Sequence, residues 1–147
     1  MKRLLMAAAA ATLLLGVTPA AVAQDVFPYR DGNYWFVTGI HVKDGSALTY
    51  ANHLARVWQV QMDYAKSKGW MTGYHILTNE NPRQDEPDLY LVTITDRMVG
   101  ADEAEKRGQE MRAYMKKTMQ QMEAESGQRA DYRTVGSNML LREQIRR

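Results

Sequence analysis

A small set of histidine, aromatic and amide side chains could do chemistry if they met in one pocket. Trp35 and His41 fall on the same side of an expected strand, because alternate side chains face the same way. His75, Thr93 and Asn138 each lie in a different expected strand. If these sides coincide, an imidazole, an indole and an amide line one cavity suited to a small organic ligand. His41 or His75 would then be available as a general base.

A structural interpretation of the same residues is favoured over the catalytic one. The alternation along one strand does not determine its phase against the next strand, so the five residues are expected to be hydrogen-bonded members of the core or of an interface. With the third strand between the first and second, His41 and His75 would be about 9–10 Å apart. Two ligands of one metal must lie much closer, so the sequence predicts no metal site and no cofactor.

Methionine is the other residue type that invites a chemical interpretation. Met111, Met115, Met119 and Met122 repeat at helical spacing. Thioethers bind Cu(I), but this spacing is more typical of the packed face of a helix. The chain has no phosphate-binding glycine loop and no nucleophile elbow, so these methionines and the two strand histidines are the main candidates for chemistry.

The first residues have the pattern of an export signal. Lys2 and Arg3 precede an apolar run over residues 4–15, and small residues lead up to Ala23. The run is shorter than the roughly 20 residues that cross a bilayer. We expect residues 1–23 to be a signal peptide, cleaved between Ala23 and Gln24, and the mature protein to be periplasmic or secreted.

Composition excludes several classes of function. Of the 19 Lys and Arg residues, Lys2 and Arg3 lie in the signal, so 17 remain to match the 17 Asp and Glu residues. This balance gives no reason to expect binding to nucleic acid or to an anionic membrane. The chain has no cysteine, so no disulfide can stabilise it and no thiol can act as a nucleophile.

The order of expected elements predicts an α+β fold. Residues 24–33 read as an extended N-terminal arm, and residues 34–147 as one domain. Aromatic and β-branched runs predict strands, and three- to four-residue apolar spacing predicts helices. The strands are expected at residues 34–43, 71–79, 88–96 and 134–142, and the helices at residues 48–68 and 102–125. The order βαββαβ is the ferredoxin-like pattern, a four-stranded antiparallel sheet with two helices on one face.

Local signals mark the helix ends. Ser46 is expected to cap the first helix, and Gly69 to end it in a left-handed conformation. Leu48, Leu54 and Trp58 belong to the stripe expected to face the core. Asp102 with Glu105 predicts a capping box for the second helix. Ser126 and Gly127 are expected to end that helix, and residues 143–147 to form a charged tail.

Both faces of the expected sheet are apolar. The first strand carries Tyr34, Phe36 and Ile40 on one side and Trp35 and Val37 on the other. Two helices cover only one face, and soluble monomers rarely leave a large apolar patch in water. We therefore expect a homodimer that pairs sheet against sheet.

This order and length of elements resembles the dimeric α/β-barrel superfamily over nearly the whole mature chain. The resemblance implies two ferredoxin-like protomers that form a closed barrel, with ligand pockets inside it or between sheet and helices. It implies either a small-ligand-binding or interaction domain, or a small cofactor-independent enzyme, such as a monooxygenase or isomerase, with a histidine in the pocket. No catalytic signature of the superfamily matches these residues, so the resemblance assigns no residue a role.

Overall fold

The structure is a computed structural model that describes residues 26–147. The expected signal peptide and its cleavage point lie outside the described residues. The elements follow in the order β1 (Tyr29–Val42), α1 (Ala47–His53), the π-helical turn η1 (Leu54–Trp58), α2 (Gln59–Ser67), β2 (Gly73–Thr78), β3 (Leu89–Thr95), α3 (Ala101–Met115), α4 (Met119–Gln128), the 3₁₀ turn η2 (Arg129–Asp131) and β4 (Arg133–Arg146).

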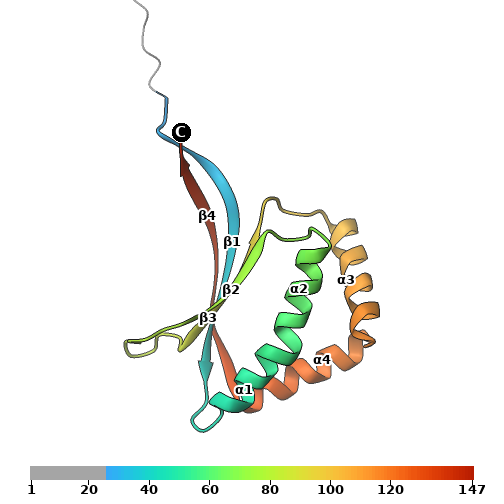
Figure 1. Cartoon of the computed structure of the whole chain (residues 1–147). Helices are drawn as coiled ribbons and strands as arrows, with labels where there is room; N and C mark the ends of the chain where they lie inside the picture. Colours follow the sequence, from blue (N-terminus) through green and yellow to red (C-terminus); the bar gives the residue numbers. More distant parts are fainter. Residues whose placement is uncertain (1–25) are drawn as a thin grey trace, which may run out of the picture.

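The strands form one antiparallel sheet in the order β2-β3-β1-β4. Strand β3 lies between β1 and β2, with Val37 opposite Val92 and His75 opposite the same residue from the other side. The helices lie on one side of this sheet (Figure 1). The predicted α+β class with a four-stranded antiparallel sheet is therefore confirmed.

The two ends of the described chain pair with each other. Strand β1 begins at Tyr29 rather than at residue 34, and β4 continues to Arg146 through the expected tail. Tyr29 lies opposite Arg146, and Gln144 donates a hydrogen bond of 2.8 Å to Asp31. These polar residues gave no apolar alternation, so a strand in this part of the chain was not predicted. The result is a long two-stranded ribbon that extends beyond the sheet (Figure 1).

The first helix has the predicted extent, and its buried stripe differs from the predicted one only at the start. It runs without a break through α1, η1 and α2, and Gly69 follows with a φ of 68° as expected. Ser46 occupies the N-cap position, although its side chain makes no capping bond. Leu48 is 75% exposed, whereas Tyr50 is 2% exposed. Leu54 is 5% exposed and Trp58 packs against the same cluster, both as predicted, so only the start of the stripe differs.

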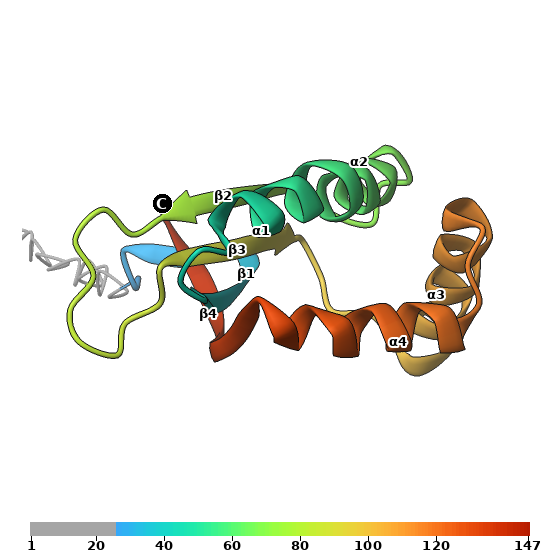
Figure 2. The same cartoon turned by 90° about the horizontal axis from the view of Figure 1, so that it is seen from below.

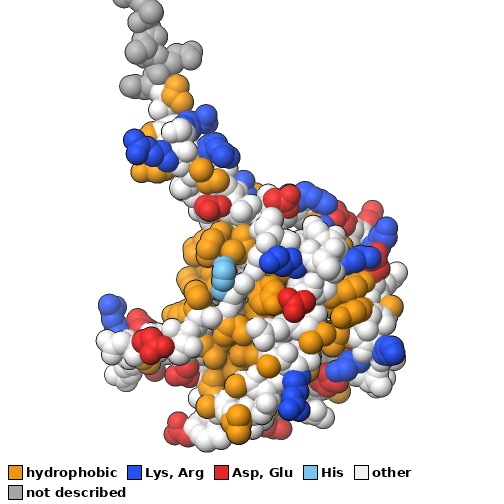
Figure 3. Space-filling view, viewed as in Figure 1, with side chains coloured by type: hydrophobic (Ala, Val, Ile, Leu, Met, Phe, Trp, Pro, Cys, Tyr) orange, Lys and Arg blue, Asp and Glu red, His pale blue; other side chains and the backbone are white. Residues whose placement is uncertain are grey.

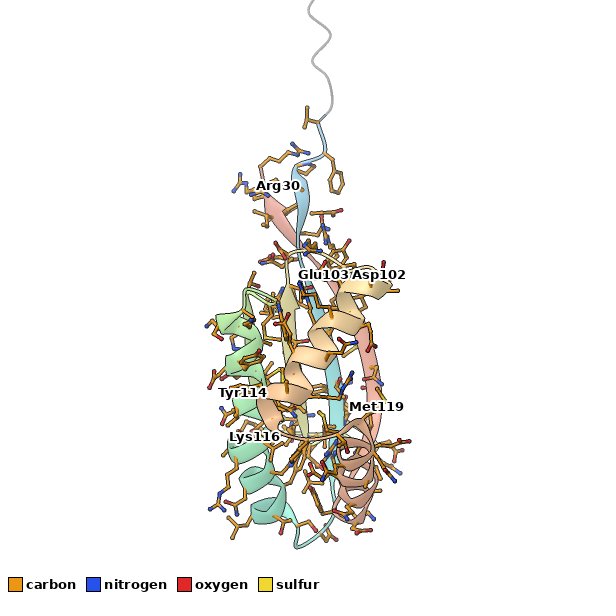
Figure 4. The ribbon with its side chains drawn as sticks, turned by 90° about the vertical axis from the view of Figure 1, so that its right-hand side faces the viewer. Arg30, Asp102, Glu103, Tyr114, Lys116 and Met119 are labelled. Atoms are coloured by element: carbon orange, nitrogen blue, oxygen red, sulfur yellow. The ribbon has the colours of Figure 1, made fainter. Side chains whose placement is uncertain are left out.

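The second predicted helix is two helices. Lys116 adopts the left-handed conformation with a φ of 53° and ends α3. Helix α4 then begins with a capping box between Thr118 and Gln121 and ends at Gln128. The capping box predicted at the start of α3 is wrong, because Gly100 occupies that N-cap without a side-chain bond. Seen from the helix side, Lys116 and Met119 mark the elbow between the two helices (Figure 4).

This break also changes the interpretation of the methionine stripe. Neither α3 nor α4 has a buried residue, and Met119 is among the exposed hydrophobic side chains. Met111, Met119 and Met122 line a shallow hollow at the elbow. The predicted packed face of a single helix is therefore wrong, since the two halves of the stripe lie on helices with different directions.

Each face of the sheet carries its own apolar cluster. On the helix face, Ile40 packs with Tyr50 and Leu54 of the first helix. On the other side, which we call the open face, Val37, Val92 and Ile94 pack with Trp35 and Tyr90, all from strands. Figure 2 shows α1 and α2 beside β2, and α4 beside β4. Within residues 26–147, no helix has the length and apolar character needed to cross a membrane.

Candidate functional site

The five residues singled out by sequence do not share a face. Trp35 and His75 lie on the open face, where their rings stack with centroids 6.2 Å apart. His41 lies on the same face, because it is an even number of positions from Trp35 and packs over Gly136 of β4. Thr93 and Asn138 lie on the helix face instead. The single pocket that the five residues were expected to line if their sides coincided is therefore not formed.

Register explains this division. Thr93 lies opposite Phe36, and Asn138 lies opposite Thr38 and accepts a hydrogen bond of 3.0 Å from its hydroxyl. Phe36 and Thr38 alternate with Trp35, so their cross-strand partners must point to the opposite side. A shift of one residue between strands would reverse this arrangement, which is why sequence could not determine it.

The open face carries an apolar surface. Leu77, Met139 and Leu141 are about half exposed there. Hydrophobic side chains gather over the strands on the left-hand side of the molecule (Figure 3). The Trp35 indole N–H is buried and has no hydrogen-bond partner among the described residues. A buried donor of this kind costs about 1–3 kcal/mol.

A cavity of about 270 Å³ lies on the other side, between the helix face of the sheet and the helices. Strand residues form its floor, among them Phe36, Thr38 and Thr93. The first helix supplies one wall, and Met122 and Arg129 from α4 and η2 supply the opposite one. The cavity forms because α4 lies at the β4 side, while α1 and α2 lie at the β2 side (Figure 2).

The π-helical turn faces this cavity. Leu54, Val57 and Trp58 of η1 all line it. The Trp58 ring packs edge-on against the Tyr74 ring, with centroids 5.4 Å apart. A π-helical turn leaves the regular hydrogen-bond ladder, and such turns occur often at functional sites. This five-residue segment therefore places three apolar side chains toward one space.

One end of the cavity is polar and cationic. Arg129, Arg133, His53 and Glu125 line it. Glu125 is paired with Lys117 at 2.6 Å. Within residues 26–147, neither Arg129 nor Arg133 forms an ion pair with a carboxylate within 4.0 Å.

Two ionisable side chains beside these arginines, His53 and Tyr50, have pKa values that are shifted by burial and by the arginine charges. Burial lowers the pKa of His53, and the charges of Arg129 and Arg133 lower it further. Burial raises the pKa of Tyr50, against the opposing effect of the same two arginines. The rings of Tyr50 and His53 stack with centroids 6.1 Å apart. His53, expected to be a solvated helix residue, is therefore part of the candidate site and is neutral near pH 7.

Two further hollows adjoin the cavity. A wider one of about 470 Å³ lies beyond Tyr50 and Leu54, which line both spaces. A smaller one, lined by Gln128 at the end of α4, shares His53 and Arg129 with the cavity and adds Lys117. The polar end of the cavity thus adjoins a second opening toward solvent.

The sequence contained little signal for this site. Arg129 and Arg133 stand at the junction of a helix and a strand, where basic residues are common on any surface. Their meeting with His53 depends on how α4 crosses the sheet. Among the described residues there is no group of three or more His, Asp or Glu side chains arranged to hold a metal ion.

Comparison of this chain with protein-family models, with curated proteins and with solved structures finds no match. The geometry of the cavity and of the two sheet faces is therefore the basis for any functional argument.

Proposed function

We propose that this protein is an exported, dimeric domain that binds a small apolar or aromatic ligand in the cavity between its sheet and its helices. The cavity on the helix face carries this proposal. It combines apolar and aromatic walls with a few polar groups at one end, which is the usual composition of a small-ligand site. Its volume is slightly below the range of about 300–1,000 Å³ found for drug-sized ligands, so a small ligand is indicated.

The arrangement of the sheet supports a ferredoxin-like fold of the dimeric α/β-barrel kind. Read from the other edge, the strand order is β4-β1-β3-β2, with crossovers through helices on one face. This is the order that a split βαβ unit produces. In such a fold a pocket between sheet and helices can hold the ligand, and the open face is then free for a second copy.

Blocking the cavity tests ligand binding. Thr93→Phe places a ring on the cavity floor, whereas Thr49→Phe adds the same ring at an exposed position of α1. We expect 2-naphthalenemethanol to bind the wild type and Thr49→Phe with one site per chain in calorimetric titrations. Thr93→Phe should lose this binding while keeping the wild-type circular dichroism spectrum. Equal binding to both variants would exclude this cavity as the site.

The open face supports the homodimer. Its apolar side chains lack a covering helix, and burying them against a second copy would remove them from water. Sedimentation equilibrium at micromolar concentration should give twice the mass of the mature chain. A stable monomer under these conditions would contradict the dimeric part of the proposal.

A second candidate function is a cofactor-independent enzyme. The Trp35–His75 stack favours it, because two open faces brought together would enclose an aromatic ring beside an imidazole. His41→Ala and His75→Ala should then abolish turnover of a quinol or aromatic substrate without lowering the melting temperature. If the same variants lower the melting temperature and no turnover is found in the wild type, the histidines are structural.

A further inference from the structure

The cationic end of the cavity identifies the chemical class of ligand. Resting on the proposed function, we infer that the ligand is a small acid, with an apolar body and a carboxylate that binds between Arg129 and Arg133. Both guanidinium groups border the cavity beside His53. Guanidinium groups present paired N–H donors that match the two oxygens of a carboxylate.

The side chains at this end of the cavity carry a net positive charge, which favours the binding of an anion. Glu125 is the acidic residue among the lining side chains, and Lys117 already neutralises it through an ion pair of 2.6 Å. Arg129 and Arg133 are both partly buried and have no carboxylate within 4.0 Å in the described part of the chain. Partly desolvated cations gain most from a bound anion, because little water competes for their donors.

The rest of the cavity matches the body of such an acid. Phe36, Leu54, Trp58 and Leu91 line the same cavity and supply its apolar and aromatic walls. A volume of about 270 Å³ suits one or two fused rings, or a short branched chain, rather than a long fatty acyl chain. The carboxylate of the bound acid would face outward, because the hollow that adjoins the arginines also contains Lys117 and opens beside α4.

A matched pair of probes tests this inference. 2-Naphthoate and 2-naphthalenemethanol have the same ring system and differ in the charge of the head group. We expect the full-length mature protein to bind the acid at least about tenfold more tightly than the alcohol in calorimetric titrations. Arg129→Gln and Arg133→Gln should each remove most of this preference and leave the affinity for the alcohol unchanged.

Arg56→Gln is the matched control variant. Arg56 is exposed on η1 and does not line the cavity, so the same loss of charge there should leave the preference for the acid intact. Circular dichroism of each variant checks that the fold is retained.

The outcomes separate this inference from the proposed function. If neither probe binds, or if Thr93→Phe binds both probes as the wild type does, ligand binding in this cavity is excluded and the inference falls with it. If both probes bind with equal affinity, the cavity binds a ligand but the acid preference is wrong. If Arg129→Gln and Arg133→Gln keep the full preference, or Arg56→Gln loses it, the assigned carboxylate position is wrong.

Discussion

The two faces of this sheet use neighbouring residues of the same strands in different ways. On the helix face, Ile40 packs beneath Tyr50 and Leu54. A cavity nevertheless remains above Phe36, and it is lined by two arginines that form no ion pair within residues 26–147. On the open face, strand side chains alone form a solid cluster, and its edge is left half exposed. One face therefore has space and charge, which suit a small ligand, and the other has apolar surface, which suits association.

The helices explain this difference. Helices α3 and α4 bury no residue. Helix α3 contacts the first helix through Tyr114, whose ring stacks on that of Tyr64 with centroids 3.9 Å apart. The elbow at Lys116 then turns α4 toward β4. Figure 4 shows Tyr114 beside the first helix and Lys116 at the elbow. Because the helix layer is divided in this way, it covers the margins of the sheet and leaves the space between them incompletely filled.

The largest expected effect concerns the packed part of the helix face. Ile40 is 1% exposed between the sheet and the first helix. Ile40→Ala should lower the free energy of unfolding by about 2–5 kcal/mol, measured by urea denaturation, because it removes buried methylenes and leaves a cavity. Val92→Ala, at an equally buried position of the open face, should cost less, about 1–3 kcal/mol, because fewer atoms are lost. A cost below 1 kcal/mol for Ile40→Ala would contradict the packing described for this face.

The next effect distinguishes the faces as surfaces for association. Leu140 and Leu141 are adjacent in β4, similarly exposed at 53% and 48%, and point to opposite faces. Leu141→Glu should raise the dimer dissociation constant about 100-fold, roughly 2.8 kcal/mol, because it buries an unpaired charge. Leu140→Glu on the helix face is the control and should leave sedimentation unchanged. The reverse result would place the interface on the helix side.

A smaller effect is expected where a loop crosses the open face. A Cβ atom at Gly39 would lie 2.5 Å from Pro87 and 2.6 Å from the Ser137 hydroxyl. Gly39→Ala should therefore cost about 1–3 kcal/mol in urea denaturation, because the proline ring has little freedom to move. Gly73→Ala in β2 meets only Ile94 at 3.8 Å. Gly73→Ala should therefore leave the free energy of unfolding unchanged or slightly raise it. A similar loss of stability in both variants would show that the loss in Gly39→Ala does not come from the contacts with Pro87 and Ser137.

The smallest effect is a pH dependence of stability that arises from His53 on the helix face. Burial and the two arginines lower the pKa of His53 below its ordinary 6.5, so the unfolded chain takes up the proton more readily than the folded one. Stability is therefore greatest above about pH 6.5 and decreases as the pH falls toward the folded pKa. His53→Gln should flatten this part of the profile in urea midpoints compared at about pH 7.5 and pH 5.5. An unchanged slope in His53→Gln would contradict the buried environment of this imidazole.

Much of the fold could be predicted because its signals are local. Aromatic and β-branched runs marked the centres of all four strands, and Gly69 ended the first helix as expected. The predictions failed where a signal was weak or ambiguous. The polar ends of β1 and β4 lack apolar alternation, and Lys116 adopts a left-handed conformation that is uncommon for a residue with a side chain.

The candidate site was predicted only in part for a similar reason. Trp35 and His75 do meet, as their strands suggested, but Thr93 and Asn138 lie on the other face. Each residue was assigned correctly to a strand. The shared face was conditional on the sides of the strands coinciding, and the sequence could not determine this. A shift of one residue in register moves all the side chains of a strand to the opposite faces of the sheet.

The sequence by itself determined the centres of the four strands, the presence of helices between them, the order of these elements and the apolar character of both sides of the sheet. These features follow from residue types a few positions apart. The tertiary structure alone decided which residues share a face and where the helix layer divides. It also brought Arg129 and Arg133 to His53 over the same cavity. These contacts join residues far apart in the chain, and their geometry depends on strand register and on the elbow at Lys116, which no local pattern specifies.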